Sequence, residues 1–136
     1  METGILAYGA YIPKRRLSRK SIANANEWFN PALRGRTSSE RSMCNWDEDA
    51  VTMAVDAARD CLTGFSRDRI GSVQLASTSF PFHDRLNAGI VAQALGLDGE
   101  ISSLDVGCSQ RAATSGLVAA LHGIRDEDAT LFLASE

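Results

Sequence analysis

Apolar and polar positions along the first third of the chain predict a strand, a helix and a loop, in that order. Residues 4–13 form a short apolar run that ends at Pro13, which predicts a buried strand, because proline cannot donate to a ladder. Residues 15–26 predict a helix with Ser18 as its cap. The polar stretch 30–45, which contains proline, glycine and several serines, predicts a loop.

The strongest helical pattern follows directly. Asn45-Trp-Asp-Glu48 has the spacing of a capping box, and Asp47, Glu48 and Asp49 bring negative charge to the first turn, where the helix dipole favours it. We therefore interpret this carboxylate cluster as helix capping rather than as an acid–base pair. Apolar residues then recur at helical spacing: Ala50, Val51, Ala54, Val55, Ala58, Cys61 and Leu62. Gly64 can end the helix.

The rest of the chain alternates between strands and helices. Strands are predicted within residues 70–79, 101–106 and 130–135, and helices over residues 87–95 and 109–123. The last helix has a surface of small residues, which suits a helix buried between layers. This order predicts an α/β layered sheet with mostly parallel strands, organised as one domain.

Composition narrows the class of protein. The chain has 136 residues, of which 44% are hydrophobic and 23% charged, enough for the core of one soluble domain. No apolar run approaches the roughly 20 residues of a membrane span, and a net charge of -3 gives no broad basic face for nucleic acid. The N-terminus lacks the pattern of a secretory signal, and three widely spaced cysteines do not indicate a disulfide framework. We therefore expect a cytoplasmic protein.

Cys108 is the sharpest candidate for chemistry. It lies where the strand 101–106 meets the helix 109–123, so its thiol is expected to face unpaired N–H groups and the positive end of the helix dipole. Both features favour the thiolate and therefore a nucleophile, and the same donors can stabilise an oxyanion on an acyl group attached to sulfur. The alternative is a small buried hydrophobic residue, as most free cysteines are.

The other cysteines and the histidines are weaker candidates. Cys61 falls on the apolar face of its helix, and Cys44 lies in a polar stretch. His83 is expected to be a solvated loop residue and His122 to end a helix, where a cation suits the dipole. No two of these residues have metal-ligand spacing, so no metal site is expected.

Basic residues gather early in the chain. Eight of the fourteen lysines and arginines lie between Lys14 and Arg41. They form either a solvated face or a phosphate site, which Trp28 could support by stacking its ring on a base. Neither glycine-rich phosphate motif occurs, so a nucleotide cofactor bound in those ways is not supported.

The whole chain resembles the N-terminal part of the thiolase-superfamily condensing enzymes, closest to the hydroxymethylglutaryl-CoA synthase-like branch. The opening apolar run, the helix after residue 47 and the segment Asn87–Leu97 resemble that branch in order. Asp105-Val-Gly-Cys-Ser109 resembles its nucleophile motif, which places Cys108 at the acyl-accepting cysteine. Asn26-Glu-Trp-Phe29 also resembles the adenine-contacting segment of β-ketoacyl-ACP synthase III.

The resemblance implies a five-layer αβαβα fold of two similar halves, with residues 1–136 covering most of the N-terminal half. It implies an acyl thioester on Cys108 and carbon–carbon bond formation with a second acyl-CoA, with coenzyme A thioester as substrate and no other cofactor. It also implies coenzyme A contacts, for which Trp28, Arg34, Arg36 and Arg111 are the candidates. Expected partners are the missing C-terminal half, in cis or in trans, a homo- or hetero-oligomer, and an OB-fold acyl-CoA-binding protein.

Two departures from the family leave alternatives open. Thr78 falls where hydroxymethylglutaryl-CoA synthases carry a catalytic Glu, and a hydroxyl cannot act as that base at neutral pH, so we keep Thr78 only as a polar neighbour of the site. The catalytic His of the superfamily comes from the second half. Genuine hydroxymethylglutaryl-CoA synthase activity is therefore not expected. The chain is predicted to be either part of an acyl-CoA condensing or acyl-transfer enzyme (a thiolase, ketoacyl synthase, acyltransferase or aldolase) or a non-catalytic subunit that binds acyl-CoA or scaffolds an enzyme. An unrelated α/β domain, with Cys108 in its core, is the third alternative.

Overall fold

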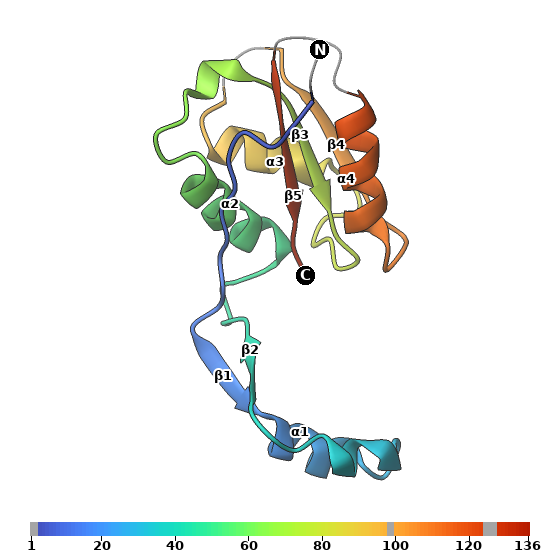
Figure 1. Cartoon of the computed structure of the whole chain (residues 1–136). Coiled ribbons are helices and arrows are strands. Elements are labelled where there is room, and N and C mark those ends of the chain that lie inside the picture. Colours follow the sequence, from blue (N-terminus) through green and yellow to red (C-terminus); the bar gives the residue numbers. More distant parts are fainter. Residues whose placement is uncertain (1–2, 98–99, 124–127) are drawn as a thin grey trace. The chain divides into compact units, whose positions relative to one another are not determined.

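The computed structural model describes residues 3–97, 100–123 and 128–136, and the chain forms two compact units. The larger unit comprises Met1–Tyr11 and Glu48–Glu136, and the smaller one Ile12–Asp47. Figure 1 shows the helices and strands of both along the chain. Among the described residues, no helix is both long and apolar enough to cross a membrane.

The larger unit is built on a three-stranded parallel sheet. β3 (Ile70–Ala76) is the central strand, with β4 (Ser102–Val106) on one side and β5 (Ala129–Ala134) on the other. The 3-10 helix η2 (Arg67–Arg69) leads into β3. The predicted alternation of strands and helices, and the parallel sheet that it implies, are confirmed.

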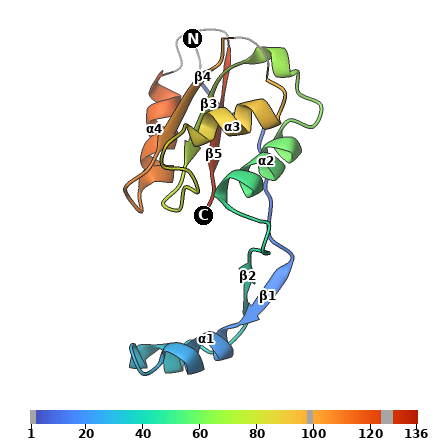
Figure 2. The ribbon, with the colours of Figure 1, turned by 180° about the vertical axis from the view of Figure 1, so that it is seen from behind.

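Helices cover both faces of this sheet. α4 (Ala112–Gly123) lies on one face in Figure 1, and α3 (Asn87–Ala94) crosses the other in Figure 2. The buried residues of α4 are Ala112, Gly116 and Ala120, spaced four apart on one side of the helix. A Cβ at Gly116 would lie 2.9 Å from the Phe132 ring, so this small-residue surface lets α4 pack close to the sheet.

The helix α2 (Ala50–Cys61) packs against α3 and contributes half of its residues to the core. Its cap differs from the predicted Asn45–Glu48 pattern, which is wrong. Asp49 is the N-cap, with its carboxylate accepting from the Thr52 N–H at 2.8 Å, while the Thr52 hydroxyl accepts from the Asp49 N–H at 2.7 Å. Several adjacent residues of this segment are of types that can cap a helix. Asp49 is the cap because its backbone is extended where the helix begins.

The predicted strand at residues 4–13 is also wrong, since no strand is formed by residues 3–13. Within the larger unit, this segment runs along α2 instead. In a strand, the Ala10 N–H would donate to a carbonyl of the neighbouring strand. Here it donates to the Asp60 carboxylate at 2.9 Å. A Cβ at Gly9 would lie 2.2 Å from the Cys61 nitrogen, so only glycine allows this close approach.

The smaller unit contains more regular structure than its polar sequence predicts. β1 (Arg15–Ser18) pairs antiparallel with β2 (Glu40–Met43), and between them lie α1 (Arg19–Asn26) and the 3-10 helix η1 (Pro31–Gly35). The predicted helix therefore begins at Arg19 rather than at residue 15, and the predicted loop contains a strand. Ser18 is the N-cap by position, without a side-chain capping bond. The exposed residues of β2 give no apolar alternation, which is why the sequence did not indicate it.

Candidate active site

Cys108 occupies an unusual backbone conformation two residues after β4. Its φ is +63°, and among the described residues Ser39 is the other non-glycine residue with a positive φ. The left-handed region costs an L-residue about 1–2 kcal/mol, so the surrounding structure must hold Cys108 there. Strain of this kind is concentrated at functional sites. The side chain is exposed, which contradicts the alternative of a core cysteine.

The segment after Cys108 is a turn before it becomes a helix. The helix was predicted to begin at Ser109, which is wrong, because α4 begins at Ala112. Ser109 closes a turn in place of a first helical turn: its carbonyl accepts from the Ala112 N–H at 2.9 Å and its hydroxyl from the Arg111 N–H at 3.1 Å. The left-handed backbone, more than the helix N-terminus, therefore distinguishes Cys108.

The sheet register aligns Cys108 with two further residues at its carboxyl edge. Ala76 of β3 pairs with Val106 of β4 and with Ala134 of β5. Thr78, Cys108 and Glu136 each lie two residues beyond that row. The Ser77 N–H donates to the Val106 carbonyl at 3.1 Å and the Ser135 N–H to the Ala76 carbonyl at 3.1 Å, so the alignment extends past the strands. Neighbouring strands are about 4.8 Å apart, and this edge is where open α/β sheets bind ligands.

The Glu136 carboxylate is bound to Thr78. One carboxylate oxygen accepts from the Thr78 N–H at 2.8 Å, and the other from the Thr78 hydroxyl at 2.6 Å and the Ser79 hydroxyl at 3.3 Å. The sequence pattern did not indicate Glu136 as a residue of this site. Its position directly after a predicted parallel strand was the available signal, because the carboxyl ends of such strands meet at one edge.

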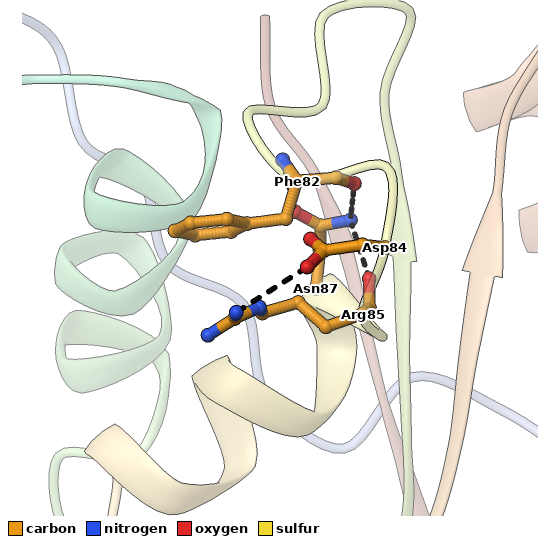
Figure 3. A network of polar contacts seen from close by, with 4 residues as sticks. All are labelled: Phe82, Asp84, Arg85 and Asn87. Atoms are coloured by element: carbon orange, nitrogen blue, oxygen red, sulfur yellow. Dashed lines mark hydrogen bonds and ion pairs between the residues drawn. The ribbon is translucent and has the colours of Figure 1, made fainter.

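The loop between β3 and α3 is fixed around Asn87. Figure 3 shows the Asn87 side-chain amide donating to the carbonyls of Phe82, at 2.9 Å, and Arg85, at 3.5 Å. In the same loop Arg85 pairs with Asp84 at 3.4 Å and lies over the Phe82 ring. Asn87 is 1% exposed, so the loop that borders the candidate site is anchored on a buried amide.

The proposed coenzyme A contacts are distributed over both units. Arg111 is exposed and lies three residues after Cys108. Trp28, Arg34 and Arg36 are exposed residues of the smaller unit, where Arg34 pairs with Glu27 at 3.0 Å. Their binding roles stay predictions.

The remaining titratable candidates do not form a second site. Burial, and secondly the Asp60 carboxylate, raise the pKa of the Cys61 thiol above its ordinary value, which disfavours its thiolate. Cys44 and His83 are exposed, and His122 lies in the last turn of α4, as predicted. In the part of the chain that the structure describes, no group of three His, Cys, Asp or Glu residues could hold a metal ion.

A hydrophobic cavity of about 440 Å³ lies elsewhere in the larger unit. It runs along β5, between the N-terminal segment from Thr3 to Gly9 and one end of α4. None of Cys108, Thr78 and Glu136 lines it, so it is separate from the candidate active site.

Comparison with known proteins supports the thiolase-like fold. Over 125 residues the chain is 37% identical to the hydroxymethylglutaryl-CoA synthase of Pyrobaculum aerophilum, covering 88% of this chain and 35% of that enzyme. The hydroxymethylglutaryl synthase of the curacin biosynthetic pathway, solved in complex with an acetyl donor-ACP, superposes with a TM-score of 0.82 at 21% identity, covering 98% of this chain and 34% of that one. MvaS in complex with 3-hydroxy-3-methylglutaryl coenzyme A gives 0.74 at 25% identity, covering 90% and 30%. No family model matches the chain.

Fold and site together define a layered α/β domain of thiolase-like fold, with a cysteine at the strand-to-helix junction. Its sequence is similar to the hydroxymethylglutaryl-CoA synthases, and its fold is that of the thiolase-like enzymes. It spans about a third of the length of the curated relatives that it matches.

Proposed function

We propose that this chain provides the nucleophile of an acyl-CoA condensing or acyl-transfer enzyme, with Cys108 as the acyl acceptor. The single observation that carries the proposal is the exposed Cys108 in a left-handed backbone, at the carboxyl edge of a parallel sheet of thiolase type. A nucleophile needs access to its substrate and a fixed geometry, and this position provides both.

The reaction at Cys108 is thioester exchange. Its sulfur attacks the carbonyl carbon of an acyl-CoA, the bond from that carbon to the coenzyme A sulfur breaks, and the proton of Cys108 goes to the departing thiolate. The following condensation requires acid–base catalysis, to which the superfamily contributes a histidine. By the superfamily resemblance, that histidine comes from the second half of the fold, in the same chain or in another one.

Two further features of the proposal concern binding. Arg111, together with Trp28, Arg34 and Arg36, is proposed to contact coenzyme A, whose phosphates suit guanidinium groups. Leu104, Leu117 and Val118 are exposed apolar residues of β4 and α4, which supports a partner that covers them: the second half, a second copy or an OB-fold acyl-CoA-binding protein.

The test is acetylation of the full-length gene product by acetyl-CoA, followed by mass spectrometry of its peptides. We expect one acetyl group on the peptide that contains Cys108, none there in Cys108→Ala, and an unchanged adduct in the matched control Cys44→Ala. Absence of the adduct in the wild-type protein, or the same adduct in Cys108→Ala, would overturn the proposal. Binding of acetyl-CoA without any adduct would instead favour the non-catalytic, acyl-CoA-binding subunit.

A further inference from the structure

The side chain of Thr78 has no carboxylate, but the carboxylate of Glu136 lies against it. By the superfamily resemblance, position 78 is where hydroxymethylglutaryl-CoA synthases carry a catalytic Glu. In this chain the Glu136 carboxylate binds both the N–H and the hydroxyl of Thr78. We propose that Glu136, held by Thr78, is the group that moves the α-proton of an acyl group on Cys108. This inference rests on the acylation of Cys108 proposed above.

The three donors around Glu136 fix its carboxylate in place. The Thr78 N–H belongs to the backbone that follows β3, so it cannot rotate away, and the Thr78 hydroxyl approaches the second oxygen to 2.6 Å. The Ser79 hydroxyl makes a third contact, and the Ser79 N–H donates to the hydroxyl of the buried Ser77 at 3.0 Å. The turn that presents these donors is therefore tied to the sheet.

Register places this carboxylate at the same edge of the sheet as Cys108, two strands away, with Thr78 between them. Thr78 follows the central strand, with Cys108 after one neighbouring strand and Glu136 after the other, all two residues past one paired row. Gly107, next to Cys108, approaches this turn closely: a Cβ there would lie 3.5 Å from the Ser77 carbonyl oxygen. The proposed step requires a short acyl chain on Cys108 to extend over the Thr78 turn, and Glu136 is exposed, so that its carboxylate can exchange protons with water.

The proposed step conserves atoms and charge. A carboxylate oxygen of Glu136 takes a proton from the carbon next to the thioester carbonyl, and the electron pair of that C–H bond moves into an enolate whose charge lies on the thioester oxygen. Glu136 becomes a neutral carboxylic acid. The enolate carbon then attacks the thioester carbonyl carbon of a second acyl-CoA, the bond from that carbon to the coenzyme A sulfur breaks, and the departing thiolate takes the proton from Glu136. Alternatively the enolate regains a hydrogen from Glu136, which reverses the step.

Reversal in heavy water gives a direct measurement. The full-length gene product is incubated with acetyl-CoA in heavy water, quenched and digested in ordinary water, and the mass of the acetyl group on the Cys108 peptide is recorded. Deuterium on carbon survives digestion, whereas amide deuterium is lost equally from the acetylated and unacetylated peptides. One spectrum therefore reports both acylation and α-proton exchange.

The variants separate the role of Glu136 from a merely structural one. We expect Glu136→Gln to retain acetylation of Cys108 and to slow deuterium incorporation at least about tenfold, since a positioned base contributes about 10²–10⁴-fold. Thr78→Val, which removes the hydroxyl donor, should also slow exchange, and Thr78→Ser should preserve it. Thr78→Glu combined with Glu136→Ala should restore exchange, because it returns a carboxylate to the same place. Glu40→Gln, an exposed glutamate of the smaller unit, is the matched control and should change nothing.

Each result bears on one proposal or on both. Acetylation with no exchange above that of free acetyl-CoA, or unchanged exchange in Glu136→Gln, overturns the role of Glu136 and leaves the acyl-acceptor role of Cys108 standing. Absence of acetylation overturns both proposals. If Glu136→Gln unfolds the protein, as judged by circular dichroism, the doubly substituted variant decides: a folded double variant without exchange contradicts the inference.

Discussion

The carboxylate of Asp105 on β4 caps the first turn of α3 through Asn87. One of its oxygens accepts from the Asn87 N–H at 2.8 Å and from the Asn87 side-chain amide at 2.9 Å, and the other from the Ala88 N–H at 2.7 Å. The N-cap residue of α3, Leu86, offers no side-chain acceptor, so a residue distant in sequence satisfies the free N–H groups of the helix. The same contacts hold the loop that borders the candidate site.

The first prediction concerns this cap. Asp105→Ala is expected to lower the free energy of unfolding by about 2–4 kcal/mol, because it removes charged hydrogen bonds and leaves the buried Asn87 amide short of a partner. Denaturant unfolding followed by circular dichroism measures the loss. Asp84→Ala is the control: among the described residues Asp84 pairs with the exposed Arg85, and we expect a change below about 0.5 kcal/mol. Equal losses in the two variants would contradict the assigned cap.

Beyond its N-terminal segment, the larger unit could be predicted from the sequence because its pattern of apolar residues is periodic. The alternating strands and helices, the parallel sheet and the location of Cys108 between β4 and α4 were all predicted, since buried strands and one-sided helices leave a clear apolar record. The boundaries moved by one to three residues because turns such as Cys108–Arg111 contain residues that are acceptable in a helix.

What the sequence did not indicate depends on contacts between distant residues. The interaction of Glu136 with Thr78 joins residues that are adjacent only because β3 and β5 are paired, and Asp105 caps a helix 18 residues earlier in the chain. The N-terminal apolar run was mistaken for a buried strand. It pairs with no strand among the described residues, and its Ile5, Leu6 and Tyr8 side chains are exposed. The Ala10 N–H of this run donates to the Asp60 side chain rather than to a neighbouring strand.

The packing of this N-terminal segment on α2 gives the second prediction. Gly9→Ala should lower the free energy of unfolding by more than about 1 kcal/mol, because the added methyl would overlap the backbone nitrogen of Cys61 and the carbonyl of Ala57, which cannot move aside as a side chain can. Gly4→Ala is the matched control, since nothing lies within 4 Å of its added methyl. The midpoint of thermal unfolding is measured for both variants. Indistinguishable midpoints would disprove the close contact of Gly9 with the backbone of α2.

The third prediction tests which residue caps α2. Asp49→Ala should destabilise the protein by about 1 kcal/mol, within the range of about 0.5–2 kcal/mol found for N-caps, because it leaves the Thr52 N–H without its acceptor. Asp56→Ala, on the exposed side of the same helix, removes only a surface pair with Arg59 and should cost less than about 0.5 kcal/mol. Urea unfolding of the two variants provides the comparison, and the opposite ranking would reject Asp49 as the cap.

The fourth prediction uses the three cysteines as internal references for one another. Burial raises the pKa of the Cys61 thiol, so at a pH near the ordinary thiol value it stays protonated to a greater extent and reacts more slowly with iodoacetamide than an exposed cysteine. We expect Cys61 to be the slowest of the three, with its rate increasing at higher pH. Since the unfolded thiol ionises first, Cys61 should also stabilise the fold less as pH rises through this range. Peptide mass spectrometry at several pH values measures the rates, and a Cys61 rate equal to that of Cys44 at every pH would refute the prediction.

The last prediction concerns the strain at Cys108 itself. At φ +63° a residue with a Cβ is disfavoured and glycine is not, so Cys108→Gly should be more stable than Cys108→Ala by about 1 kcal/mol. At Cys44, whose φ is not in the left-handed region, the order should reverse, because glycine there only adds freedom to the unfolded chain. The free energies of unfolding of the four variants test this. A stability gain on replacing Cys108 by glycine means that the thiol is kept at a cost to the fold, which is expected of a residue retained for chemistry rather than for packing. Equal stabilities of the glycine and alanine variants at position 108 would show that the backbone relaxes and that no strain is stored at the nucleophile.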